Sequence, residues 1–445
     1  MKKKLYCIIL SLAMVITMMP AMSFTAYAAG DHNDNWGYLS NAMTGNAQVS
    51  VPDVIQVTDN SPEAGTRTIK LLTDITAGAD DTYLNVSNSP KVILDLNGHT
   101  IDRGLTEKDP KSDGFVIRVS SNAYLTVTDN TLDEPGKITG GNSSGDCGAI
   151  YVYKSTLLLE KGVITGNHAY EGGGAILLDT DANFVMNGGT ISDNSAGKAG
   201  GAIYVNNGTK FIMNDGAITG NKALSNSAFS NNSNNGYGGA VYVDDSGSVT
   251  LLGGSITENH AKNCAGGVGC NCSITVGGKI NISGNTSGNR NNADNVYLRD
   301  KRAAEKSLPA PKIIVSTEKP LVSGASIGVS NETEASNISD DSTLLNYLFA
   351  DNSKYVLKLV EGEIQLVDQS GGGTTQICPM LNLVYKACVK AVTLSLKFQQ
   401  MQRVLNFKIQ QHKAIHSVVS TSIKIAQTIR TVTMMQLMKI QHFML

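Results

Sequence analysis

The sequence contains few aromatic residues and a single tryptophan: Phe, Trp and Tyr together make up 6% of the 445 residues. This composition does not fit large globular domains with aromatic-rich cores. Glycine is abundant instead, and all 45 glycines lie between Gly30 and Gly373. Such a chain builds its interior from small and β-branched side chains, which is typical of all-β and repeat proteins.

Positive charge is scarce in the central part of the chain. Three of the 36 Lys and Arg residues lie at positions 2–4 and nine lie after residue 375. Residues 29–375 therefore carry 24 basic against 38 acidic residues, a net charge of −14. A segment without a basic face cannot neutralise phosphates, so nucleic acid is excluded as a partner, whereas Ca²⁺ or a cationic surface is compatible.

Long apolar runs are absent beyond the N-terminus. The stretch Leu5–Met19 follows Lys2, Lys3 and Lys4 and is too short to span a bilayer. Ala26-Tyr27-Ala28 then supplies the small-x-small pattern of a signal-peptidase site. We expect residues 1–28 to be a cleaved signal peptide rather than a membrane anchor. The product would be secreted or held at the cell surface, and would not span the membrane.

Four cysteines remain between residues 29 and 375, and their spacing does not match a zinc ribbon. In an exported protein they can form disulfides or stay as buried or free thiols, and a metal site is the least favoured interpretation. These cysteines are Cys147, Cys264, Cys270 and Cys272.

A repeat of rows organises the middle of the sequence. Each row begins with a Gly-Ala box, continues with an apolar triplet, and closes with a Gly-x-Ile-Thr/Ser-x-Asn box. The closing asparagines stand 27, 27 and 38 residues apart, and the long step contains a Ser/Asn-rich insertion at residues 225–235 that we interpret as a loop. The boxes begin at Gly148, Gly174, Gly201 and Gly239.

Apolar residues alternate within each row, as in Ile150 and Val152 on either side of Tyr151. This period of two indicates short strands. Three strands per row without a helix predict one coil of a parallel β-helix, stacked about 4.8 Å from the next. We predict an all-β fold, a right-handed parallel β-helix solenoid of about nine or ten coils over residues 50–368. Degraded rows such as Tyr355–Val367 are expected to continue it at the ends.

The segments outside the solenoid differ in composition. Residues 29–49 are expected to be a flexible or capping N-terminus, and residues 369–375 a Gly/Thr linker. Residues 376–445 contain nine basic residues and no acidic ones. Because they show no amphipathic stripe, we interpret them as a basic tail that is disordered or read out of frame, in preference to a membrane-touching helix.

The asparagine that closes each row lies where the coil turns. Stacked amides can hydrogen-bond to their equivalents above and below. We therefore interpret these asparagines as a structural ladder rather than as ligand groups. The ladder consists of Asn167, Asn194, Asn221 and Asn259.

The Gly-Gly-Ala-Ile boxes at residues 173–176 and 200–203, with the segment Val92–His99, resemble the repeats of right-handed β-helix surface proteins. They are similar to the GGAI repeats of polymorphic outer-membrane adhesins, within the wider pectin-lyase-like superfamily. The resemblance covers about residues 65–368. It implies an adhesin or surface display protein, although the superfamily also contains enzymes.

Recognisable catalytic boxes are absent from the sequence. The Asn-Thr-Asp, Gly-His-Gly and Arg-Ile-Lys boxes of polygalacturonases do not occur, and the adjacent Asp pairs lie apart at residues 80–81, 244–245 and 340–341. A glycosidase needs an acid and a base at a defined separation. We name no catalytic residue and favour binding, with a polysaccharide lyase or glycoside hydrolase as the alternative.

Three tyrosines fall at one offset after the Gly-Ala boxes: Tyr151, Tyr204 and Tyr242. Facing outward, they would form a flat aromatic strip for sugar rings or a partner protein. The β-propensity of tyrosine on a solvent face explains them equally well. Glycans or surface proteins are the expected partners.

A second outward column consists of Asp179, Asn206 and Asp244. Oxygen ligands at successive coils can hold Ca²⁺, although Asp and Asn are also common in turns. We expect no other cofactor.

Overall fold

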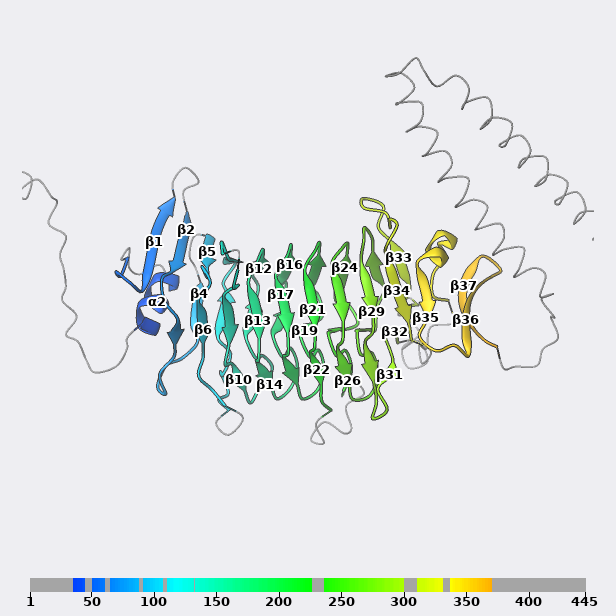
Figure 1. The fold of residues 1–445 in the computed structure, drawn as a ribbon, viewed down its shortest axis with the longest axis horizontal. Coiled ribbons are helices and arrows are strands. Elements are labelled where there is room, and N and C mark those ends of the chain that lie inside the picture. Colours follow the sequence, from blue (N-terminus) through cyan, green and yellow to red (C-terminus); the bar gives the residue numbers. More distant parts are fainter. Residues whose placement is uncertain are drawn as a thin grey trace, which may run out of the picture. The chain divides into compact units, whose positions relative to one another are not determined.

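The computed structural model describes residues 35–44, 50–60, 65–87, 91–106, 110–131, 133–225, 236–299, 310–330 and 337–369. The predicted signal peptide, nearly all of the predicted linker, the basic tail and the insertion from residue 226 onward lie outside the described residues. Strands predominate, and most of them pair in parallel with the equivalent strand of the next coil (Figure 1). The predicted parallel β-helix is confirmed.

The first sheet takes one strand from each coil. Nine of its strands run parallel in chain order, and β1 (Ile55–Asn60) pairs antiparallel with the first of them. The nine are β2 (Thr66–Leu71), β5 (Lys91–Asp95), β8 (Tyr124–Thr128), β12 (Thr156–Leu159), β16 (Asn183–Met186), β20 (Lys210–Met213), β24 (Ser248–Leu251), β28 (Ile274–Val276) and β33 (Ile313–Val315).

The second sheet takes two strands from most coils, so it contains two columns. One column is β4 (Leu84–Ser87), β7 (Ile117–Ser120), β11 (Ile150–Tyr153), β15 (Ile176–Asp179), β19 (Ile203–Val205), β23 (Val241–Val243), β27 (Val268–Cys270) and β32 (Val296–Leu298). The other is β3 (Ile75–Thr76), β6 (Thr100–Asp102), β9 (Lys137–Thr139), β13 (Val163–Thr165), β17 (Thr190–Ser192), β21 (Ala217–Thr219), β25 (Ser255–Thr257), β29 (Asn281–Ser283), β34 (Ser326–Val329) and β35 (Leu348–Ala350).

A third, narrow sheet lies at the turn after the asparagine of each row. Its six parallel strands of two residues are joined at the end by one antiparallel strand. They are β10 (Asn142–Ser143), β14 (His168–Ala169), β18 (Ser195–Ala196), β22 (Lys222–Ala223), β26 (His260–Ala261) and β30 (Thr286–Ser287), followed by β31 (Asn292–Ala293).

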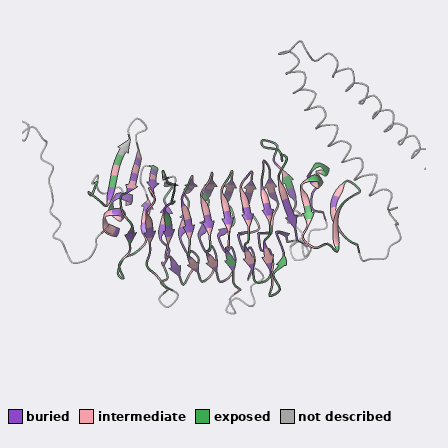
Figure 2. Ribbon diagram, in the orientation of Figure 1, coloured by how far each residue is buried: buried purple, intermediate pink, exposed green. Residues whose placement is uncertain are grey.

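The hydrophobic core consists of columns that run from coil to coil. Every second side chain of a strand points inward, which produces the alternating burial in Figure 2. In-register pairing then places Ile164 against Ile191 and Phe184 against Phe211. These side chains are at most 1% exposed, and the two phenylalanine rings stack with centroids 5.0 Å apart. Each such side chain contributes roughly 1.5–3 kcal/mol through burial.

The asparagines of successive rows form a hydrogen-bonded chain inside the turn. Oδ1 of Asn221 accepts from both the backbone N and Nδ2 of Asn194, each at 3.0 Å. Nδ2 of Asn194 also donates to the carbonyl oxygen of Ile164 at 2.9 Å. The same pattern continues through Asn167, Asn194, Asn221, Asn259, Asn285 and Asn295. All six are at most 1% exposed, so the amides satisfy polar groups that water cannot reach.

The asparagine chain ends at a carboxyl group. Asn295 donates to Asp351 through its backbone N at 2.6 Å and through Nδ2 at 2.5 Å. Burial raises the pKa of Asp351 to about 6, because it outweighs these two hydrogen bonds, which favour the ionised form. The negative charge of Asp294 raises the pKa further.

Both ends of the described coils are covered. At the first end, α2 (Asn35–Thr44) buries Trp36, Leu39 and Met43, and the indole Nε1 of Trp36 donates to the carbonyl oxygen of Thr82 at 2.9 Å. This helix was not predicted within residues 29–49. A solenoid needs such a cover at each end because a terminal coil otherwise exposes its core to water.

At the other end, η3 (Ser342–Asn346) precedes two strands, β36 (Tyr355–Val360) and β37 (Glu363–Asp368). The prediction that residues 355–367 continue the coils is wrong, because these strands form an antiparallel hairpin. The reason is the two-residue turn between them: Glu361 and Gly362 both have positive φ, 52° and 90°. Positive φ at both central residues is the requirement of a type I′ hairpin turn.

We predict that Asn221→Ala lowers the free energy of unfolding by about 3–5 kcal/mol, because it leaves several buried donors and acceptors unsatisfied. The matched control is Asn214→Ala in the same coil, whose Nδ2 donates to Oδ1 of Asn187 in an exposed amide pair at 2.8 Å. The control should change stability by no more than about 0.5 kcal/mol. Urea denaturation measures both, and equal losses would contradict the structural role of the buried ladder.

Asp351 predicts a defined pH dependence of stability. Its pKa is raised to about 6 in the folded chain, so its contribution is complete below the unfolded value of about 3.9 and is lost as the pH rises through about 6. The wild type should lose up to about 2–3 kcal/mol relative to Asp351→Asn across this interval. If the free energies of unfolding of the two proteins change in parallel from acid to neutral pH, the pKa of Asp351 is not raised in the folded chain.

Candidate functional site

In several successive coils, the segment that precedes the strand folds back and packs against the outward side chains of the second sheet. In-register pairing aligns the outward side chains of β11, β15, β19 and β23. These side chains are Tyr151, Leu177, Tyr204 and Tyr242. The segments that precede β15, β19, β23 and β27 pair with one another, from Gly172 to Ala199, from Ala199 to Tyr237, and from Tyr237 to Cys264.

The expected flat, solvent-facing tyrosine strip is wrong for two of its three members. Tyr242 is 1% exposed and Tyr204 is 9% exposed, whereas Tyr151 is half-buried. The folded-back segments cover the column and form a second hydrophobic cluster outside the central core. The rings of Tyr204 and Tyr242 lie 5.1 Å apart within it.

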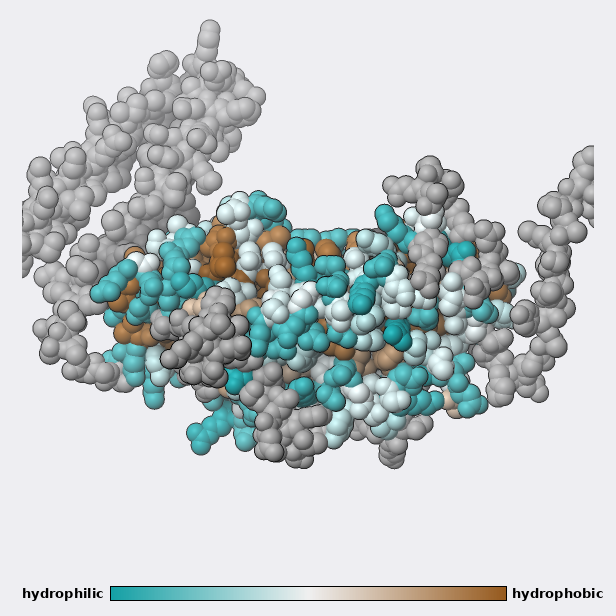
Figure 3. Space-filling model, turned by 180° about the vertical axis from the view of Figure 1, so that it is seen from behind, coloured by the Kyte–Doolittle hydropathy of each residue, from teal (hydrophilic) through white to brown (hydrophobic). Residues whose placement is uncertain are grey.

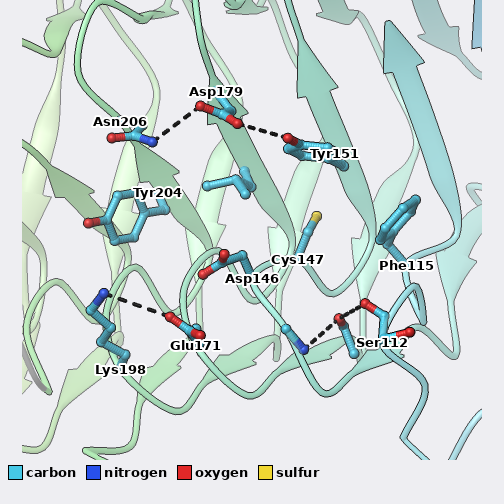
Figure 4. Close-up of a pocket in the computed structure, with 13 residues that line it drawn as sticks. Ser112, Phe115, Asp146, Cys147, Tyr151, Glu171, Asp179, Lys198, Tyr204 and Asn206 are labelled. Carbon is cyan, nitrogen blue, oxygen red and sulfur yellow. Dashed lines mark hydrogen bonds and ion pairs between the residues drawn. The ribbon is translucent and has the colours of Figure 1, made fainter. Parts of the chain in front are cut away.

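A pocket of about 460 Å³ opens in this cluster above β15. It brings together four of the six predicted binding residues: Tyr151, Asp179, Tyr204 and Asn206. Figure 4 shows an apolar middle between two polar rims. The remaining lining residues are Ser112, Phe115, Ser143, Gly145, Asp146, Cys147, Glu171, Leu177 and Lys198.

The first rim is built around Asp179. Its Oδ2 accepts from the hydroxyl of Tyr151 at 2.8 Å, and its Oδ1 accepts from Oγ1 of Thr180 at 3.0 Å and from Nδ2 of Asn206 at 3.3 Å. Burial and the Asp179 carboxylate raise the pKa of Tyr151. Tyr151 therefore remains a neutral donor at physiological pH.

The second rim carries the opposing charges. Nζ of Lys198 lies 3.9 Å from Oε2 of Glu171, and Asp146 lies on the same rim beside Glu171 (Figure 4). Burial raises the pKa of Glu171, the charge of Asp146 raises it further, and Lys198 opposes both effects. This rim thus holds two carboxyl groups against one ammonium group.

The floor of the pocket depends on a glycine, Gly172, which has no side chain. A Cβ atom at Gly172 would lie 2.5 Å from Cδ2 of Tyr204, which is a clash. The glycine therefore allows the Tyr204 ring to lie against the folded-back segment. The hydroxyl of Tyr204 makes no hydrogen bond to the part of the chain that the structure describes, although the residue is 9% exposed.

The column predicted to bind Ca²⁺ does stack, because the strand register places Asp179, Asn206 and Asp244 at successive coils. Its members bond to neighbouring amides: Asn206 donates to Asp179, and Asn271 donates to Oδ1 of Asp244 at 3.2 Å. Among the described residues there is no group of three or more His, Cys, Asp or Glu that could hold a metal ion. Only Asp179 and Asn206 reach the pocket.

Three of the four central cysteines are free thiols: Cys147 and Cys270 are buried, and Cys272 is half-buried. Burial raises the pKa of all three, to about 12 for Cys272. The buried-thiol interpretation therefore holds for these residues. Although Cys147 lines the pocket, it is a protonated, apolar group there rather than a nucleophile.

The surface seen from behind is mostly hydrophilic, with apolar residues in separate groups (Figure 3). Scattered exposed apolar side chains are normal on soluble surfaces. Among the helices that the structure describes, none has the length and apolar character needed to cross a membrane.

Sequence reasoning missed the second rim. Glu171 and Lys198 each lie three residues before a Gly-Ala box, at Gly174 and Gly201. The available signal was that successive rows carry an acidic residue, Glu171, and a basic residue, Lys198, at the same offset. Its meaning depended on the folded-back segment, which the repeat pattern alone did not predict.

Comparison with known proteins returned no match: no family model, curated protein or solved structure matches this chain. The site is therefore defined by its geometry, and the functional side of the adhesin resemblance stays an expectation.

Proposed function

We propose that this chain binds a short saccharide in the pocket above β15, as an exported, adhesin-like β-helix. The observation that supports the proposal is the lining, an apolar floor between two hydrogen-bonding rims (Figure 4). A pyranose ring has the complementary form, because its C–H faces are apolar and its edges carry hydroxyl groups.

The dimensions of the floor suit this ligand. Leu177 lies between Tyr151 and Tyr204 in the strand register. The two tyrosines are thus two coils apart, roughly 10 Å. A pocket of about 460 Å³ falls within the usual range of small-molecule sites. The floor can therefore support one or a few sugar rings.

The rims supply the groups that sugar hydroxyls need. A hydroxyl both donates and accepts, and it pairs best with a carboxylate or an amide. Asp179 accepts on one side of the floor and Asn206 offers both functions next to it, while Lys198 and Glu171 offer a donor and an acceptor on the other side. Polar groups placed on both sides would fix the orientation of a ring.

The location of the protein belongs to the same proposal. The signal sequence predicted for residues 1–28 supports export, and stacked coils present the pocket on an extended surface. The partner would then be a host or matrix glycan, or the sugar of a glycosylated surface protein.

Hydrolysis is a second candidate, because three carboxyl groups line the pocket: Asp146, Glu171 and Asp179. The geometry favours binding over hydrolysis. Glycosidase carboxyls stand about 5–9.5 Å apart and flank the scissile bond, whereas Asp146 and Glu171 lie together on one rim of the pocket (Figure 4). Both oxygens of Asp179 accept hydrogen bonds, which makes the carboxylate a weaker nucleophile, whereas its remaining lone pairs can still accept from a sugar hydroxyl.

A glycan array of neutral, amino and uronic saccharides, followed by calorimetry on the strongest hit, tests the proposal. Asp179→Asn and Tyr204→Phe should each weaken binding about three- to tenfold, because each removes one polar contact while preserving packing. The matched control is Tyr124→Phe, whose ring is 46% exposed and lies outside the pocket.

If Asp179→Asn and Tyr204→Phe bind the saccharide as tightly as the control and the wild type do, the ligand binds outside this pocket. A folded protein with no array signal would refute saccharide binding. Release of reducing ends that Glu171→Gln abolishes would replace binding with hydrolysis.

A further inference from the structure

The charges around the pocket are unequal. Three carboxyl groups line it, and Lys198 is the one cationic group among its lining residues. Asp244 and Asp245 lie close enough to add to the negative field at Tyr204. Arg118 lies near Tyr151, with its guanidinium carbon 5.7 Å from the ring centroid, but it is not part of the lining. A ligand in this pocket therefore meets net negative charge.

The pair Asp146 and Glu171 concentrates this charge at the second rim. Two neighbouring carboxylates repel each other unless a proton or a cation lies between them. Lys198, at 3.9 Å from Glu171, balances one of the two charges. One negative charge is left for a proton or for a cationic group of the ligand.

A second observation points to a ligand in the same pocket. Tyr204 lines the pocket and is 9% exposed, yet its hydroxyl has no partner within the described ranges. The hydroxyl oxygen is not fully buried, so a group in the pocket can supply the hydrogen bond that the described part of the protein does not. Burial, together with the surrounding acids, raises the pKa of this phenol, so it stays neutral. It can donate to, or accept from, a hydroxyl group of the ligand.

We infer that the preferred saccharide carries a free primary amine, with its ammonium group held at Asp146 and Glu171 and its ring on the floor beside Tyr204. This inference rests on the proposed saccharide binding. An ammonium donates up to three hydrogen bonds and neutralises the excess charge of the carboxyl pair. A uronic acid would be repelled by the same pair, and an N-acetylated sugar would lack the charge.

Calorimetry of the full chain with three probes tests the inference at mildly acidic pH: oligomers of glucosamine, of N-acetylglucosamine and of galacturonic acid. The glucosamine oligomer should bind at least about tenfold tighter than its acetylated counterpart, and the advantage should shrink at high salt. Glu171→Gln and Asp146→Asn should remove the advantage. The control Asp215→Asn changes an exposed acid outside the pocket lining and should keep it.

The outcomes distinguish the preference for a free amine from saccharide binding itself. If acetylated and free-amine oligomers bind equally and Tyr204→Phe weakens both, the amine preference is overturned and saccharide binding stands. Preferential binding of the galacturonate oligomer also overturns the amine preference. If none of the saccharides of the array or the three probes binds the folded protein, both claims fail.

Discussion

In-register parallel stacking is the constraint on which the rest of the structure depends. Each coil repeats the hydrogen bonds of the one before, so residues at one offset share one environment. The buried asparagine chain enforces this register at the turn, because each side-chain oxygen accepts from both the backbone N and the Nδ2 of its neighbour, as Oδ1 of Asn221 does from Asn194. A shift of one residue would break every link at once.

The pocket is a consequence of the same stacking. The register that buries isoleucines on one side of β15 places Leu177 between Tyr151 and Tyr204 on the other. The folded-back segments then close over the tyrosines and leave a space above the leucine. Since Gly172 has no side chain, the Tyr204 ring can form part of the floor. Sugar recognition would thus use positions that the repeat leaves free to vary.

The sequence predicted what periodicity determines and missed what depends on turns. Strands, their parallel pairing and the asparagine positions could be predicted because they repeat. The hairpin of β36 and β37 could not, because the positive φ values of Glu361 and Gly362 override the degraded row. Periodicity also brought four of the pocket residues into the list of predicted binding residues. It could not reveal the folded-back segments, so Tyr242 was predicted to face solvent although it is 1% exposed.

The most direct test of the central claim is a crystal structure of the protein with a bound saccharide. The account predicts a ring above Leu177, with polar contacts to Asp179 on one side and Glu171 on the other. A saccharide located away from this pocket, or a pocket that remains empty at saturating ligand, would contradict it.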